Sequence, residues 1–230
     1  MTAGSRAGSP APLDGAGCFV AWHHFSRRGQ LLSHDLGLEL HLVTRLRRSR
    51  RLALLRYLLQ ARRTLQLLEA RRPRVVFVQE PPVFAVLAVS RYVARRGARM
   101  VIDAHTGAFL HPAWERWRPL QRRLARRAVA TLVTNRHLAA RVESWGGRAL
   151  VVPDIPMAQP AAKAGEGGAG GYVVVVCSFS PDEPLAEVVA AARQTPEVEW
   201  HVTGRIDDAP PDLQRELPDN VKLTGFLADD

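Results

Sequence analysis

The chain has 230 residues, of which 47% are hydrophobic and 23% are charged, so it can bury the core of one large domain or two modest ones. No uncharged run approaches the roughly 18 residues that a spanning helix requires, which excludes a helical membrane protein and favours a soluble, globular one. The net charge of +10 is uneven, because residues 1–160 carry 27 Lys and Arg against 9 Asp and Glu, whereas residues 161–230 carry 5 against 13.

The basic half indicates anionic partners, such as phosphorylated substrates, a membrane surface or nucleic acid. Nearly all of its cations are Arg, however, which a GC-rich genome would also produce without any binding role. Nucleic acid is not an expected partner, because the chain has no reader motif and no aromatic residues interleaved with the basic ones.

The N-terminal segment 1–17 is rich in Gly, Ala, Ser and Pro and lacks the apolar core of a signal peptide, so we predict a disordered leader there. Cys18 and Cys177 each lie in an apolar, strand-like run, and we interpret both as small buried hydrophobic residues. This placement argues against a disulfide framework or a metal site and predicts a reducing compartment, the cytoplasm.

Between residues 18 and 154, short apolar runs alternate with helix-length segments, which predicts a doubly wound parallel α/β sheet. The longest such segment, 49–72, has apolar residues at spacings of three and four, as in an amphipathic helix. Its expected buried stripe is Leu54, Leu58, Ala61, Leu65 and Leu68. The expected strands cover 18–22, 38–44, 75–79, 100–103, 130–134 and 150–152. The later helices cover 82–96, 114–127 and 136–145, the last capped by Asn135.

Residues 155–171 include Pro156 and end in a Gly-rich run, so we predict a hinge and linker over this segment. A second α/β domain is expected over 172–230. Its predicted elements are a strand at 172–177, a polar turn at 178–184, a helix ending near 193, and strands at 198–203 and 221–224. Three parallel strands with two helices leave part of the sheet uncovered, so we expect the natural domain to continue beyond residue 230.

The apolar run 99–103 ends in Asp103 and is followed by His105 and the Gly107 loop. Parallel sheets bind ligands at their carboxyl edge, so side chains at this point are candidates for function. An imidazole there can bind a substrate hydroxyl or take up a proton near neutral pH. Asp103 would orient His105 or act as a base. The alternatives are a loop histidine satisfied by backbone groups and an aspartate that caps the loop.

Two further segments follow predicted strands and reach the same edge. Arg27 and Arg28 come shortly after the first strand and are suited to clamp a phosphate through bidentate hydrogen bonds, although surface arginines without a ligand are an equal alternative. Glu80 ends the third strand and is a candidate to bind a hydroxyl, with a rigid turn at the following Pro pair as the alternative. His23 and His24 have no companions at zinc-site spacing, so no metal site is expected.

Six sequence segments carry a resemblance to a known family: 101–109, 132–138, 151–156, 177–184, 201–204 and 221–226. Taken in order, they resemble the GT-B glycosyltransferases and are similar to the family-4 bacterial members that act in cell-surface polysaccharide assembly. The resemblance implies two Rossmann-like lobes, at 18–154 and 172–230, with the second truncated. It also implies retaining transfer of a hexose from a nucleotide-diphosphate sugar to a lipid-linked or polysaccharide acceptor, without a metal ion or other cofactor.

The resemblance also suggests roles for single residues. It places His105 where similar enzymes keep a substrate-positioning histidine, with Asp103 beside it. The acceptor cleft would be completed by Arg27, Arg28, Gly107 and Glu80. The donor would be held by Ser178, Ser180, Gly204 and Arg205.

One departure from the family stands out in the second domain. Similar enzymes hold the donor diphosphate with a basic pair after the first strand of this lobe, whereas here the turn carries Asp182 and Glu183, which would repel phosphate. The acidic motif that grips the donor sugar lies, in the family, beyond the end of this chain. The alternative function is therefore a non-catalytic module of GT-B origin that binds a partner enzyme or an anionic membrane surface.

The membrane version of that alternative has a candidate surface in the sequence. The basic segment 45–74 is suited to dock on anionic lipid, which would place the protein peripherally on the inner face of the plasma membrane and suit a lipid-linked acceptor. The competing interpretation is a solvated helix face packed on the sheet.

Overall fold

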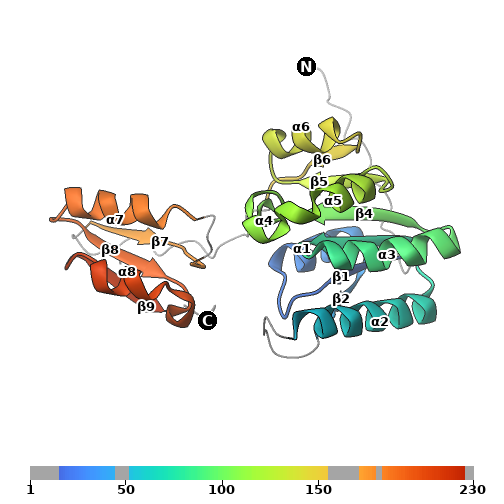
Figure 1. Cartoon of the computed structure of the whole chain (residues 1–230), viewed down its shortest axis with the longest axis horizontal. Helices are drawn as coiled ribbons and strands as arrows, with labels where there is room; N and C mark the ends of the chain where they lie inside the picture. The colour runs from blue at the N-terminus through green and yellow to red at the C-terminus, as the bar shows by residue number, and fades with distance from the viewer. Residues whose placement is uncertain (1–15, 45–51, 155–170, 180–182, 226–230) are drawn as a thin grey trace, which may run out of the picture. The chain divides into compact units, whose positions relative to one another are not determined.

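The computed structural model describes residues 16–44, 52–154, 171–179 and 183–225. The chain divides into two compact units, residues 1–156 and 157–230, each of which is an α/β unit (Figure 1). This division falls inside the segment predicted as hinge and linker. Nearly all of that segment, and the predicted leader up to residue 15, lie outside the described residues.

The first unit is a six-stranded parallel sheet in the order β2-β1-β3-β4-β5-β6. The chain moves from β1 to one side and then returns to build the other side, which is the doubly wound topology expected from the alternation. Its strands are β1 (Gly17–Ala21), β2 (Glu39–Leu42), β3 (Val75–Glu80), β4 (Arg99–Ala104), β5 (Ala130–Val133) and β6 (Ala149–Val151). Its helices are α1 (Arg27–Leu36), α2 (Ala53–Arg71), α3 (Val83–Arg96), α4 (Thr106–Leu110), the 3₁₀ helix η1 (Pro112–Trp117), α5 (Arg118–Ala125) and α6 (Arg136–Ser144).

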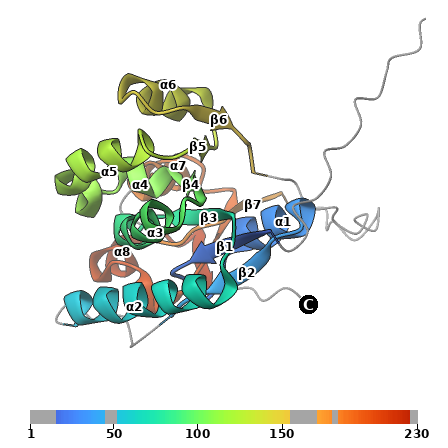
Figure 2. The ribbon, with the colours of Figure 1, turned by 90° about the vertical axis from the view of Figure 1, so that its right-hand side faces the viewer.

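Alternate residues of β1 show how helices cover the two faces of this sheet. Phe19 and Ala21 pack with Leu32 of α1. Cys18 and Val20 point to the opposite face, which α2, α3 and α5 cover (Figure 2). Successive side chains of a strand point to opposite faces, so both faces of β1 are buried and the strand is apolar throughout.

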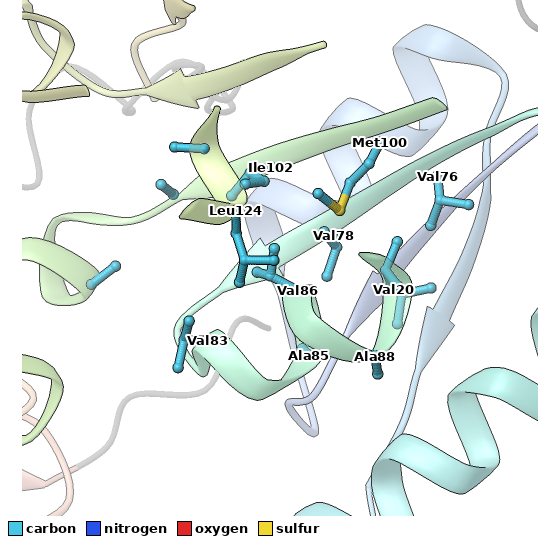
Figure 3. Close-up of a cluster of buried hydrophobic side chains, with 14 of the residues drawn as sticks. Val20, Val76, Val78, Val83, Ala85, Val86, Ala88, Met100, Ile102 and Leu124 are labelled. Carbon is cyan, nitrogen blue, oxygen red and sulfur yellow. The ribbon is translucent and has the colours of Figure 1, made fainter. Parts of the chain in front are cut away.

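The main core lies between β3, β4 and α3 (Figure 3). Val76 and Val78 of β3 and Ile102 of β4 are buried there against Val83 and Val86 at the start of α3. Burial of each such side chain contributes about 1.5 to 3 kcal/mol. This core holds the carboxyl ends of β3 and β4 in register, with Gln79 opposite Asp103.

The predicted apolar stripe of α2 is wrong at its N-terminal end. Leu54 and Leu58 are exposed, and the buried residues of the helix are Gln60, Thr64 and Leu68. Gln60 Nε2 donates to the carbonyl of Val43 at 2.9 Å, and Trp22 Nε1 donates to Thr64 Oγ1 at 2.9 Å. Because these two polar residues find partners inside the unit, they face the sheet and turn the leucines outward.

Two further helix predictions are resolved by the structure. Asn135 caps α6 as expected, since its Oδ1 accepts from the backbone N–H of Leu138 at 2.9 Å. The single helix predicted over 114–127 is instead η1 followed by α5. Pro119 lies in the first turn of α5, where the missing N–H costs nothing, and so the α-helix begins beside it.

The second unit contains a three-stranded parallel sheet in the order β7-β8-β9. Its core joins Cys177, Phe179, Ala192, Val202 and Val221, among others. Among the described residues, Tyr172, Val174 and Val176 remain exposed, so part of the sheet surface is uncovered, as predicted. The elements are β7 (Tyr172–Val175), α7 (Leu185–Gln194), β8 (Glu199–Thr203), the 3₁₀ helix η2 (Ile206–Asp208), α8 (Pro211–Glu216) and β9 (Val221–Gly225).

Two kinds of feature, a membrane-spanning helix and a metal-binding cluster, are absent from the described residues. Within them, no helix combines the length and the apolar character needed to cross a membrane. The same part of the chain holds no group of three or more His, Cys, Asp or Glu side chains that could bind a metal ion.

Candidate functional site

The carboxyl edge of the first sheet brings Asp103 and His105 together as the sequence predicts. The Asp103 carboxylate is fully buried at the end of β4, and its Oδ2 lies 3.3 Å from Nε2 of His105. The backbone N–H of His105 donates to the carbonyl of Glu80 at 2.8 Å, which ties the residue to the end of β3. The His105 side chain remains 34% exposed, so a fixed imidazole is presented to solvent.

This pairing has a chemical consequence for the ring. If the carboxylate accepts the Nε2 proton, the neutral imidazole keeps Nδ1 as its acceptor. The pair can therefore orient a hydroxyl and accept its proton.

Arg28 is buried and is not placed as a phosphate clamp. Its Nε donates to Asp103 Oδ1 at 2.8 Å, and its Nη1 lies 3.0 Å from Asp154 Oδ1. The remaining contacts are with the carbonyls of Val152, at 2.8 Å, and Pro153, at 3.2 Å. The expectation that Arg28 grips a ligand phosphate is therefore corrected. The guanidinium is engaged in hydrogen bonds inside the first unit, where it neutralises the buried carboxylate of Asp103.

A second network fixes the start of α1, the helix that carries Arg28, and it joins residues that are far apart in the sequence. Ser26 caps α1 by accepting from the backbone N–H of Gly29 at 3.0 Å, and its hydroxyl donates to Gln79 Oε1 at 2.6 Å. A Cβ at Gly29 would lie 2.7 Å from Ser26 Oγ, so this position requires glycine. Ser26 before a helix is a recognisable cap signal, but its partner is 53 residues away.

Arg27 and Gly107 also lie at this edge. The Arg27 guanidinium stacks over the ring of Phe25, 5.8 Å from its centroid. Gly107 is in α4, two residues after His105, and an added Cβ there would meet no described atom within 4 Å. The space around Gly107 is therefore open.

Glu80 does not face the edge as predicted. Its side chain is buried, and Nε2 of Gln121 donates to its Oε1 at 3.1 Å. Burial raises the pKa of this carboxyl to about 7, and the hydrogen bond from Gln121 opposes the shift only in part. The same Gln121 nitrogen donates to the carbonyl of Ala108 at 2.9 Å. Glu80 therefore supports the segment that follows His105, and we remove it from the acceptor contacts.

In the second unit, the turn predicted to hold phosphate is occupied by a carboxylate. The backbone N–H of Ser178 lies 3.0 Å from Glu183 Oε2, and the Ser178 hydroxyl donates to Oε1 at 2.9 Å. The thiol of Cys177 also donates to Oε2, at 3.1 Å. The donors expected to bind a diphosphate thus bind Glu183. Ser180 lies outside the described residues.

The other predicted donor residues follow β8. Gly204 has a φ of 127°, and a Cβ there would lie 2.3 Å from the carbonyl oxygen of Cys177. Only glycine permits this close approach, which brings Gly204 beside the Ser178 turn. Arg205 is exposed and forms a 3.7 Å ion pair with Asp208.

Comparison with known families decides the affiliation of the first unit. The model of the glycosyl transferase 4-like domain matches residues 5–154. The chain belongs to the glycosyl transferase 4-like family. The family match covers the sheet and the Asp103–His105 pair, and it confirms the resemblance found in the sequence. No curated protein sequence matches the chain.

Solved structures similar to this glycosyl transferase 4-like chain confirm the predicted fold class. HepE of Anabaena in complex with UDP has a TM-score of 0.58 and 14% identity, over 92% of this chain and 69% of HepE. The lipopolysaccharide outer core galactosyltransferase WaaB has a TM-score of 0.53 and 12% identity, over 92% and 68%. Sucrose-phosphate synthase from Thermosynechococcus elongatus has a TM-score of 0.54 and 14% identity, over 73% and 50%. The chain thus spans between half and about two thirds of these structures.

Proposed function

We propose that this chain acts in sugar transfer from a nucleotide-diphosphate donor, with the first unit binding the acceptor at its carboxyl edge. The observation that carries the proposal is the fixed and partly exposed His105, paired with buried Asp103 inside the family-matched unit. The HepE structures with UDP and with UDP-glucose support a nucleotide-sugar donor. We further propose a hexose as the transferred group, retention at the anomeric carbon, a lipid-linked or polysaccharide acceptor, and a cytoplasmic location.

The roles assigned to the side chains follow from their contacts. His105 binds the reacting hydroxyl of the acceptor through the ring nitrogen that does not face Asp103, and takes up its proton as the new bond forms. The bond between the anomeric carbon and the donor phosphate breaks, and the nucleoside diphosphate leaves with that electron pair. Asp103 is a positioning residue, because its carboxylate contacts the ring and keeps it oriented.

His105→Ala tests this assignment. Loss of a positioned acid–base group lowers turnover by about 10² to 10⁴-fold, and we expect a fall in that range. The measurement is release of UDP from UDP-glucose and related UDP-sugars, with a bacterial lipid extract as the source of acceptor. His34→Ala is the matched control, because His34 is strongly exposed in the last turn of α1, at the other edge of the sheet. Unchanged turnover in His105→Ala would remove His105 from the chemistry.

A second candidate function is favoured by the contacts of Glu183. Because that carboxylate already satisfies Ser178, a module that binds no donor is the alternative, acting through the first unit on a partner enzyme or a membrane. Titration calorimetry of the whole chain with UDP separates the two. Measurable binding supports the transferase, and its absence together with absent turnover supports the module.

A further inference from the structure

The first two turns of α2 and the residue before them expose a cluster of five leucines, which we call the leucine surface. The exposed fractions are 44% for Leu52, 74% for Leu54, 49% for Leu55, 60% for Leu58 and 37% for Leu59. Single exposed leucines are ordinary, but a contiguous group of this size on one helix marks an interaction surface.

The leucine surface cannot be buried by a small rotation of α2. The opposite side of the helix is fixed by Gln60 and Thr64, whose side chains bond to Val43 and Trp22. Leu68 is fully buried on the same side. A rotation that buried Leu54 and Leu58 would break these hydrogen bonds and leave the buried polar groups without partners, which is unfavourable.

The charges around the leucine surface select its partner. Arg62 and Arg63 are exposed in the next turn, and Arg56 lies over the Tyr57 ring, 5.0 Å from its centroid. The sequence from 53 to 68 contains no Asp or Glu. Exposed leucines bordered by cations alone match the chemistry of an anionic lipid surface, where apolar side chains enter the interface and arginines meet headgroups. If a second copy of the chain instead covered the leucine surface with its own, the arginines of the two copies would lie against each other and repel.

The position of the leucine surface relates it to the site. Because α2 follows β2, it starts at the carboxyl edge of the sheet, on the side where α4 follows His105 (Figure 1). Aromatic rings continue along this edge from Tyr57 to Trp117. The ring centroid of Phe84 lies 4.8 Å from that of Tyr57 and 4.7 Å from that of Trp117. Partly buried aromatic side chains of this kind suit a boundary between lipid and water.

We propose that the leucine surface, with Arg62 and Arg63, docks the first unit onto an anionic membrane and so brings the His105 edge to an acceptor held in that membrane. The docking itself rests on the exposed leucines and their cationic border. Only the delivery of an acceptor rests on the proposed function.

Vesicle sedimentation of the whole chain tests the docking. We expect binding to phosphatidylcholine vesicles that contain phosphatidylglycerol, weakened by salt, and little binding to phosphatidylcholine alone. The variant Leu54→Gln with Leu58→Gln, at exposed positions that leave the fold intact, should lower the partition coefficient about tenfold or more. Arg62→Gln with Arg63→Gln should lower it several-fold.

Matched controls separate the effect of the leucine surface on vesicle binding from the general effects of lost charge and lost hydrophobicity. Arg91→Gln with Arg95→Gln removes the same charge from exposed positions of α3, and Val129→Gln removes an exposed apolar side chain before β5. Both should bind as the unmodified chain does. Equal binding to neutral vesicles, or no effect of the leucine variant, would overturn the proposal.

The molar mass in solution provides the remaining check. A dimer that dissociates on Leu54→Gln with Leu58→Gln would show that a second copy covers the surface, which also overturns the proposal. Turnover with a water-soluble acceptor is measured separately. Retained turnover without vesicle binding refutes the docking alone, and retained vesicle binding without turnover refutes the proposed function alone.

Discussion

Each unit places a carboxylate against hydrogen-bond donors near the carboxyl end of a strand, and the two carboxylates have opposite effects. Asp103 is fully buried and holds one cation and one imidazole, and the imidazole remains partly exposed. Glu183 accepts from Cys177 and from Ser178, and Ser178 was the residue expected to bind a ligand anion. One carboxylate holds an imidazole that stays partly exposed, whereas the other occupies the hydrogen-bond donors of its turn.

The sign of a charge at a sheet edge does not determine the role of the side chain that carries it. The role depends on what the carboxylate binds. Asp103 has Arg28 to compensate it, so its second oxygen remains for His105. Glu183 accepts from a backbone N–H, a hydroxyl and a thiol, and these contacts use both of its oxygens.

The largest effect is expected when Asp103 is removed. Asp103→Ala leaves Arg28 buried without its main counter-charge, and such a loss costs about 3 to 5 kcal/mol of unfolding free energy. Urea denaturation of the whole chain measures it. The control is Glu39→Ala, which breaks the ion pair between Glu39 and Arg71, in which both side chains are about half exposed, and should cost less than about 1 kcal/mol. Similar costs for the two variants would show that Arg28 does not depend on Asp103.

Glu80 is a further buried carboxyl of the first unit, and it accepts a hydrogen bond from the amide of Gln121 instead of a cation. Its pKa of about 7 lies above the ordinary value of 4.5, so folding favours the protonated form. The stabilising effect is complete below about pH 4.5 and is lost as the pH rises toward 7. Relative to the unmodified chain, Glu80→Gln should therefore become more stable between pH 5 and 8, by up to about 2 to 3 kcal/mol.

Thermal and urea unfolding of both proteins across this pH range measures the Glu80 effect. Glu143→Gln, at an exposed position of α6, is the control and should run parallel to the unmodified chain. A constant difference between Glu80→Gln and the unmodified chain at every pH would mean that Glu80 has no raised pKa.

The smallest effect is expected at Glu183. Glu183→Gln keeps the shape of the side chain but removes the charge that competes for Ser178, so affinity for UDP should rise by about threefold to tenfold. Titration calorimetry with UDP measures it, with Glu187→Gln in the exposed first turn of α7 as the control. Equal affinity in both variants would mean that Glu183 does not block the turn.

The sheet and the Asp103–His105 pair could be predicted because both depend on residues close in sequence. Strand length, β-branched residues and the polar residues after each strand are local signals. The cap at Asn135 is equally local and was predicted correctly.

The unpredicted features depend on partners far along the chain. Arg28 bonds to Asp103, which is 75 residues away in the sequence, and to Asp154, which is 126 residues away. No rule based on sequence spacing could therefore show that its guanidinium is engaged inside the unit. The predicted buried stripe of α2 was wrong at its N-terminal end because hydrophobicity alone favours burial of Leu54 over burial of Thr64. The hydrogen bond from Trp22, which decides the orientation, crosses 42 residues.

The contacts of Arg28 have a mechanical consequence. The same guanidinium that neutralises Asp103 also holds the carbonyls of Val152 and Pro153 and the side chain of Asp154, the last described residues of the first unit. The Arg28 side chain therefore links the segment where the chain leaves the first unit directly to the carboxylate that contacts His105. A pull on residues 152–154 would be transmitted to Asp103 through this guanidinium.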